Sequence, residues 1–432
     1  MFKLSIILLF FIANQAVAEN RTKKIMFLDL LPKAIEIDQS LASAKLSYKA
    51  ATENAKASRS SIYPDATITM SSKEQDDVKI DAVNDQYTQR EIKLEINQSL
   101  YDFGEKRADI DISDLRADLT KLSINSARNN SILGAAQSYI RLKGANTQLN
   151  IALDSEKRLK KQTGLQDFKV KKGAAVATDV LQAKNALAGA ISRKVFAQGN
   201  FELAINDFET KFGFIPKDID NLQPINVPTK LIPKNKDDFR NAVYKSGDQN
   251  KQSKLTYKIS EITKDKSFAQ NFLPSLDFTS SAHYKQNDSG TRGGKTEYIA
   301  KVELTLPIEL FGTQINKHNS NLASYDVSRI SYNQSRRNLD NMINSSWISY
   351  INSKMNQSNI VNQVEIARQF LNNSQAAVKK GRGEMALIVN AQNALVNAEK
   401  SLESTNTNFA LQIYSMLSQM GKLSVKTLIL AK

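Results

Sequence analysis

Apolar and polar residues alternate in two stretches of the chain. Between about residues 64 and 100, apolar side chains such as Ile68 and Met70 are separated by polar ones such as Thr69. The same alternation recurs between about residues 274 and 308. A period of two is typical of a β-strand with one apolar and one polar face. The pattern therefore predicts two β-hairpins, at about 64–100 and 274–308.

Outside the hairpins, apolar residues recur at steps of three and four, which predicts long helices. One helix is expected before each hairpin, the first from Asp29, as its N-cap, to Ser61 and the second from Lys236 to Phe272. Two helices are expected after each hairpin, at about 105–167 and 176–213, and at about 313–376 and 384–421. A helix from 105 to 167 would be about 90 Å long at ~1.5 Å per residue.

The two halves of the chain are copies of one another. Three glycines have counterparts 208 residues later (312 − 104 = 208): Gly104 and Gly312, Gly173 and Gly381, Gly213 and Gly421. A constant offset means that no residue was inserted or deleted between these points. The predicted first copy spans 19–213 and the second spans 237–432. The linker at 214–236 holds four of the 8 prolines, which ends the first copy's last helix.

Residues 1–18 have the pattern of a signal peptide, with Lys3, an apolar run and small residues before Glu19. No later stretch approaches the ~18 apolar residues of a membrane helix. The chain has 0 Cys and 2 His, and this predicts no metal site, no cofactor and no enzymatic activity. Its charge of +15 is dispersed among acids, which favours outer-membrane lipid over nucleic acid as the anionic partner.

Four two-faced strands cannot close a membrane barrel, because even small bacterial barrels need about eight. An open sheet in lipid would leave unpaired edge groups at several kcal/mol each. If the hairpins enter a membrane, several copies of the chain must therefore pool their strands around a polar lumen. The attached helices would then continue the same cylinder.

The order of these elements resembles the TolC family of outer-membrane efflux and type I secretion channels. The specific residues are Gln98–Gly104 (QSLYDFG) after the second strand, and two Lys-Lys-Gly segments followed by 178–181 (TDVL) and 387–390 (LIVN). The resemblance implies a mostly α fold with a small membrane β portion. Its antiparallel coiled-coil helices would form an α-barrel continuous with a trimeric, 12-stranded β-barrel.

The resemblance also implies the location and the partners. The homotrimer would lie in the outer membrane of a Gram-negative bacterium, with a large periplasmic extension. It would be a passive exit duct for small molecules, for type I protein secretion, or for both. It would dock to a periplasmic adaptor (membrane fusion) protein and to an energised inner-membrane pump of the ABC, RND or MFS type.

Two groups of site residues follow from the resemblance. The periplasmic tip, and with it the adaptor contact, would comprise Lys172, Gly173, Lys380, Gly381, Arg382, Gly383 and Glu384. The gate would comprise Asp179, Leu387 and Asn390, with Asp179 paired to Arg382 or to a neighbouring basic residue. The family often has acidic rings where Leu387 and Asn390 stand, so apolar and polar packing is expected to close this entrance instead.

A soluble periplasmic coiled-coil adaptor or scaffold is the alternative interpretation. Long heptad helices fit it, but two amphipathic hairpins do not. Residues 171–172 and 379–380 have a simpler explanation as well, because lysines stabilise helix C-termini through the macrodipole.

Overall fold

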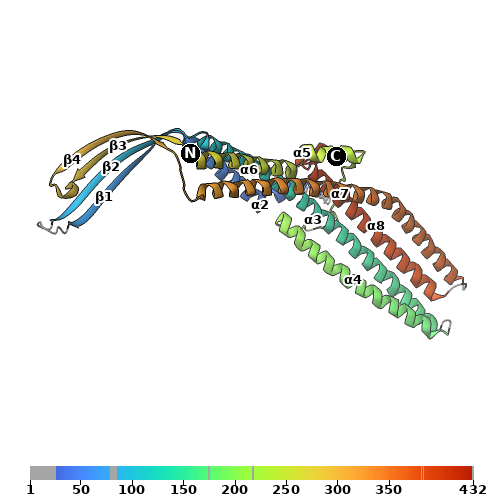
Figure 1. Ribbon diagram of the computed structural model, residues 1–432. Coiled ribbons are helices and arrows are strands. Elements are labelled where there is room, and N and C mark those ends of the chain that lie inside the picture. The colour runs from blue at the N-terminus through green and yellow to red at the C-terminus, as the bar shows by residue number, and fades with distance from the viewer. Residues whose placement is uncertain are drawn as a thin grey trace, which may run out of the picture.

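The computed structural model describes residues 26–77, 85–173, 176–216, 218–380, 382 and 384–430. The predicted signal peptide, Gly381 and Gly383 lie outside these residues. The molecule is elongated, with a small sheet at one end and a layer of long helices that leads away from it (Figure 1). This is the predicted mostly α fold with a small β portion.

The four strands form one antiparallel sheet in the order β1-β2-β3-β4. They are β1 (Asp65–Asp77), β2 (Asp85–Tyr101), β3 (Ser275–Gln286) and β4 (Gly294–Thr305). The register places Ile68, Leu94, Ala282 and Tyr298 in one row across the sheet. The next row contains Thr69, Lys93, His283 and Glu297. One face of the sheet is therefore apolar and the other is polar, as the alternation predicts.

Two helices of 67 residues each, α3 (Glu105–Lys171) and α7 (Thr313–Lys379), run the length of the helical layer. At ~1.5 Å per residue each is about 100 Å long. Shorter helices return alongside their far halves: α4 (Ala177–Phe212) follows α3, and α8 (Met385–Gln419) follows α7. The two resulting helical hairpins end apart from each other at the tip (Figure 1).

The prediction of one unbroken helix before each hairpin is wrong. The first consists of α1 (Phe27–Glu36) and α2 (Gln39–Ser60), and the second of α5 (Lys236–Ser246) and α6 (Asp248–Phe272). Asp29 lies in the first turn of α1 and is not its N-cap. The N-cap of α1 is Met26. Asp38 caps α2 instead, since its carboxylate accepts hydrogen bonds from the backbone N–H groups of Ser40 and Leu41.

The second break falls at Gly247, where the chain becomes extended between α5 and α6. A Cβ at this position would lie 2.5 Å from the carbonyl oxygen of Val243 and 3.0 Å from that of Gln419. Only glycine allows this close approach of α5 to the end of α8.

The short helices and the linker pack onto the middle of the long helices. The short helices are α1, α5, the 3-10 helix η1 (Thr229–Leu231) in the linker, and α9 (Val425–Leu430) near the C-terminus. Helix α9 was not predicted from the sequence. Phe27 of α1 meets Tyr139 of α3 edge-on, with 5.5 Å between ring centroids. In the second copy, Phe239 of α5 stacks on Trp347 of α7 at 6.1 Å. Tyr139 and Trp347 are repeat-related, so each copy anchors its short helix in the same way.

The helices follow the lateral order of the strands. Near the sheet the order is α2-α3-α6-α7, and near the tip it is α4-α3-α8-α7. The chain is therefore one segment of a wall, with β1, α2 and α4 along one side and β4 and α7 along the other.

Candidate functional site

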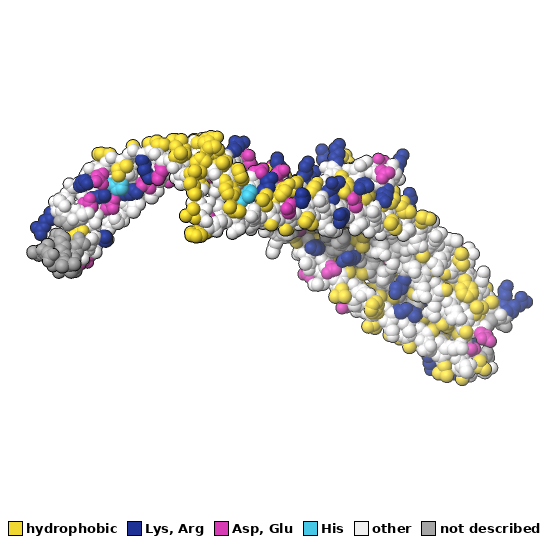
Figure 2. All heavy atoms as spheres, in the orientation of Figure 1, with side chains coloured by type: hydrophobic (Ala, Val, Ile, Leu, Met, Phe, Trp, Pro, Cys, Tyr) yellow, Lys and Arg dark blue, Asp and Glu magenta, His cyan; other side chains and the backbone are white. Residues whose placement is uncertain are grey.

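The polar face of the sheet is a network of charges and hydrogen bonds. Lys285 Nζ lies 3.0 Å from a Glu297 carboxylate oxygen, and His283 Nδ1 lies 2.8 Å from Glu91 Oε1. This face, with its Lys, Glu and His side chains, is visible in Figure 2. Charged groups held this way suit a surface in contact with water, such as the lining of a pore.

The opposite face of the sheet is apolar and uncovered. Met70 is 74% exposed and Leu304 is 68% exposed. Further apolar side chains gather where the sheet meets the helices, as Figure 2 shows. Among them Phe311 is 91% exposed and Tyr63 is 73% exposed. An apolar surface of this extent marks contact with a membrane or with another protein.

Among the helices of the described residues, none has the length and apolar character of a membrane span.

The far end of the helices contains the predicted tip residues. Lys172 is the C-cap of α3, and its backbone N–H donates to the Phe168 carbonyl at 3.1 Å. Gly173 follows with φ of 72°, the left-handed conformation that reverses the chain. Lys380 caps α7 in the same way, and the Arg382 N–H donates to the Ala377 carbonyl at 2.9 Å. Glu384 precedes the first residue of α8.

The predicted gate residues lie at the start of α4 and α8. Asp179 is half-buried in the first turn of α4, and Leu387 is half-buried near the start of α8. Asn390 is exposed and lines a 390 Å³ cavity between α4 and α8, with Gln182 and Asn185 on the other side. Within the described part of the chain, Asp179 forms no ion pair with Arg382 or with a neighbouring basic residue, so the expected pairing stays a prediction for contacts between subunits.

The cavity beside Asn390 also contains Arg193, which the sequence analysis missed. Arg193 Nη2 donates to Asn393 Oδ1 at 3.3 Å and thereby joins α4 to α8. No local motif surrounds Arg193, and its repeat counterpart is Ser401. The one sequence signal for this cavity was the repeat-related pair Asn185 and Asn393, because both residues line it.

A two-faced sheet that continues into a wall of long helices defines a class of protein, the membrane channel subunit with a helical extension. Comparison with known proteins identifies the family. The profile of the outer membrane efflux protein family matches residues 30–209 and 267–417, and the chain belongs to this family. No curated protein sequence matches the chain.

Solved channels have the same fold. The Campylobacter jejuni CmeC outer membrane channel is 16% identical, with a TM-score of 0.79 over 93% of this chain and 88% of that one. The outer-membrane channel OprN is 16% identical, with a TM-score of 0.80 over 92% and 90%. The Vibrio cholerae outer membrane protein VceC is 16% identical, with a TM-score of 0.78 over 91% and 96%.

Family membership confirms the predicted function. The protein is an outer-membrane exit duct for efflux, with a large periplasmic helical part, and it is a passive channel, not an enzyme. Channels of this family are trimeric and interact with adaptor and pump components. The alternative of a soluble scaffold is thereby set aside.

Proposed function

We propose that three copies of this chain close the duct by joining the β4 side of one copy to the β1 side of the next. Within one chain, β1 and β4 each have a single neighbouring strand, so one edge of each is unpaired. In lipid each unpaired backbone group costs several kcal/mol, and ring closure removes that cost. Three copies of the 4-stranded sheet supply twelve strands.

Exposed apolar side chains along the open sides of the helical layer support this arrangement. On α4, Leu181 and Val195 are 65% and 62% exposed and lie two heptads apart on one stripe. On α7, Ile348 and Met355 are 58% and 65% exposed and lie one heptad apart. Stripes with this spacing pack against a neighbouring helix in a coiled coil. The stripe of α7 would therefore meet the stripe of α4 from the next subunit.

The tip would dock a periplasmic adaptor protein that links the duct to an inner-membrane pump of the ABC, RND or MFS type. Lys172, Lys380 and Arg382 are exposed, and the full length of α3 and α7 separates them from the membrane. Basic groups at this distance face the periplasm and suit an acidic or polar partner surface. The family is described as efflux proteins, and the cargo that we propose is small molecules. Type I protein secretion through the same duct stays a prediction.

The gate would lie just behind the tip. Asp179, Leu387 and Asn390 belong to the first two turns of α4 and α8, where the helical hairpins of three subunits would converge. Closure would depend on packing around Leu387 and on polar contacts of Asp179 with a neighbouring subunit.

Cysteine crosslinking tests the ring, since the chain has 0 Cys of its own. Val195→Cys on α4 and Ile366→Cys on α7 can be combined in one chain and treated with a short bismaleimide in isolated outer membranes. Near these positions, Arg193 of α4 contacts Asn393 of α8, and Arg368 of α7 contacts Glu399 of α8. Because 393 and 399 are close together on α8, positions 195 and 366 lie at similar distances from the tip. The expected products are crosslinked dimers and trimers, with no larger species.

Each single-cysteine variant serves as the control and should give no trimer. Products that stop at two subunits, or that continue past three, would contradict the proposed closure. For the adaptor contact, a photoreactive residue at position 172 or 380 should capture a periplasmic protein. The same group at Lys49 on α2, far from the tip, should not capture that protein.

A further inference from the structure

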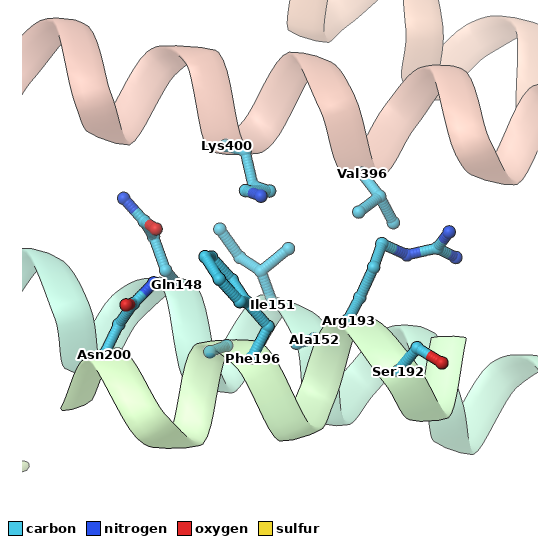
Figure 3. A pocket seen from close by; sticks show the side chains of 10 residues that line it. Gln148, Ile151, Ala152, Ser192, Arg193, Phe196, Asn200, Val396 and Lys400 are labelled. Atoms are coloured by element: carbon cyan, nitrogen blue, oxygen red, sulfur yellow. The ribbon is translucent and has the colours of Figure 1, made fainter. Parts of the chain in front are cut away.

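Three helices of one subunit enclose a cavity of 250 Å³. Its walls are α3, α4 and α8, and Figure 3 shows the lining side chains of α4 facing those of α8. On α4 the lining residues recur about one turn apart, at 192–193, 196–197 and 200. The cavity is therefore built from one continuous stripe of α4, not from a chance gap.

The lining combines an apolar floor with two cations. Ile151, Ala152 and Val396 supply apolar surface, and the ring of Phe196 stands over them, 69% exposed. Arg193 enters from α4 across from Val396, and Lys400 enters from α8 across from Phe196 (Figure 3). No carboxylate belongs to the lining.

Neither cation is neutralised by the described residues around it. Arg193 Nη2 donates to the neutral Asn393 amide, and Arg193 Nε is buried without a hydrogen-bond partner. A buried donor without an acceptor is uncommon and costs free energy. Lys400 is exposed and forms no ion pair within the described part of the chain. The neighbouring Lys194, by contrast, pairs with Glu156 at 2.9 Å.

We propose that this cavity binds a small amphiphilic anion, an aromatic or short alkyl group that carries a carboxylate or sulfonate. The apolar part would lie on Ile151 and Val396 beneath Phe196. The acid group would accept charge-assisted hydrogen bonds from Arg193 and Lys400. A cavity of about 150 Å³ is sufficient for benzene. The 250 Å³ here leaves room for one ring and its acid group.

This site goes beyond the exit-duct function and does not depend on the proposed adaptor or gate. Arg193 also lines the cavity that contains Asn390, so the two cavities share one wall residue. A bound anion would hold Arg193 close to α8 and so stabilise the packing of α4 against α8, at a point farther from the tip than the predicted gate.

Binding of 4-(trifluoromethyl)benzenesulfonate to the purified trimer, followed by fluorine NMR, tests the site. 4-(Trifluoromethyl)benzyl alcohol is the uncharged counterpart. We expect saturable binding of the sulfonate, and binding of the alcohol that is at least about tenfold weaker. Arg193→Gln and Lys400→Gln should each weaken sulfonate binding about tenfold without affecting the alcohol. Arg193→Lys, which retains the charge, should bind at an intermediate level.

Lys161→Gln is the control, because it removes an exposed cation of α3 that does not line the cavity. Phe196→Ala should weaken binding of both probes. The proposal is overturned if the trimer shows no saturable sulfonate binding, as it would if side chains of a neighbouring subunit fill the cavity. It is equally overturned if both cation variants bind like the unmodified protein. Neither result would affect the crosslinking that tests the ring.

Discussion

Tyr139 of α3 and Tyr414 of α8 donate hydrogen bonds to the same linker. The Tyr139 hydroxyl donates to the Gln223 carbonyl oxygen at 2.6 Å, and the Tyr414 hydroxyl donates to the Asn226 carbonyl oxygen at 2.9 Å. Both rings meet Phe27 edge-on, at 5.5 and 6.2 Å between centroids. The two copies, the linker and α1 are thus joined at one point.

Removing either hydroxyl should loosen this junction. In Tyr139→Phe or Tyr414→Phe the ring stays and a buried hydrogen bond is lost, which costs about 1–2 kcal/mol. Thermal unfolding of the purified trimer, followed by circular dichroism, should show a lower Tm for each variant. Tyr63→Phe, at a ring that is 73% exposed, is the control and should leave the Tm unchanged. An unchanged Tm in both buried variants would mean that the linker is held in another way.

The same two tyrosines predict a loss of stability at alkaline pH. Burial raises the pKa of Tyr139, and the nearby Asp29 carboxylate adds to this effect. Burial also raises the pKa of Tyr414, with a contribution from Tyr139. Since the folded-state pKa exceeds the unfolded value, the unfolded chain releases these protons first. The stabilisation is complete below about pH 10, the ordinary tyrosine pKa, and is lost as pH rises beyond it.

The drop in Tm between pH 9 and pH 11 should therefore be smaller in the Tyr139→Phe, Tyr414→Phe double variant than in the unmodified protein. Deprotonation of lysines and exposed tyrosines affects both proteins alike and cancels in the comparison. Equal decreases in Tm for the double variant and the unmodified protein would show that these hydroxyls do not lose their protons on unfolding.

Two repeat-related glycines should differ in their tolerance of a side chain. Gly213 and Gly421 end α4 and α8 with φ of 72° and 63°, so alanine at either position costs about 1–2 kcal/mol of backbone strain. A Cβ at Gly213 would meet only the Ile37 side chain, at 3.2 Å. At Gly421 it would lie 2.7 Å from the backbone oxygen of Ser246, which cannot move aside easily.

Gly421→Ala should accordingly lower the Tm more than Gly213→Ala. Gly164→Ala is the matched control: a Cβ there has open space about two turns before the end of α3, and better helix propensity should raise stability by up to about 1 kcal/mol. Equal decreases in Tm for Gly213→Ala and Gly421→Ala would indicate that the corner between α5 and α6 shifts to admit the methyl group.

The proposed gate predicts leakier channels when its packing is removed. In planar bilayers, Leu387→Ala and Asp179→Ala should each raise the open probability several-fold, because each removes a contact present only in the closed state. Leu153→Ala, an exposed leucine of α3 far from the tip, should behave like the unmodified channel. Unchanged open probability in both gate variants would rule out this gate.

Much of the fold could be predicted from local patterns. Alternation placed Ile68 and Leu94 on the same face of the sheet, and the heptad spacing after Gly104 and Gly312 predicted α3 and α7. The Asp38-Gln39-Ser40 segment contains a capping signal that could have located the break before α2. The break at Gly247 also had a signal, because Gly-Asp is a common start of a helix.

Other features could not be predicted from the sequence by itself. Arg193 lies in no motif, and its importance comes from meeting Asn393, which is 200 residues away in the chain. The helical hairpins α3–α4 and α7–α8 end apart at the tip, a separation that no local pattern around Asp179 or Arg382 could predict (Figure 1).

The sequence by itself determined which face of each element is apolar, where the chain repeats and where the linker must lie. These properties depend on residues a few positions apart, whose relation is set by helix and strand geometry. Only the tertiary structure decided which apolar face meets which partner, why Gly421 is more constrained than Gly213, and that Arg193 and Lys400 line one cavity. Those outcomes depend on how distant segments pack, and packing is a property of the whole chain.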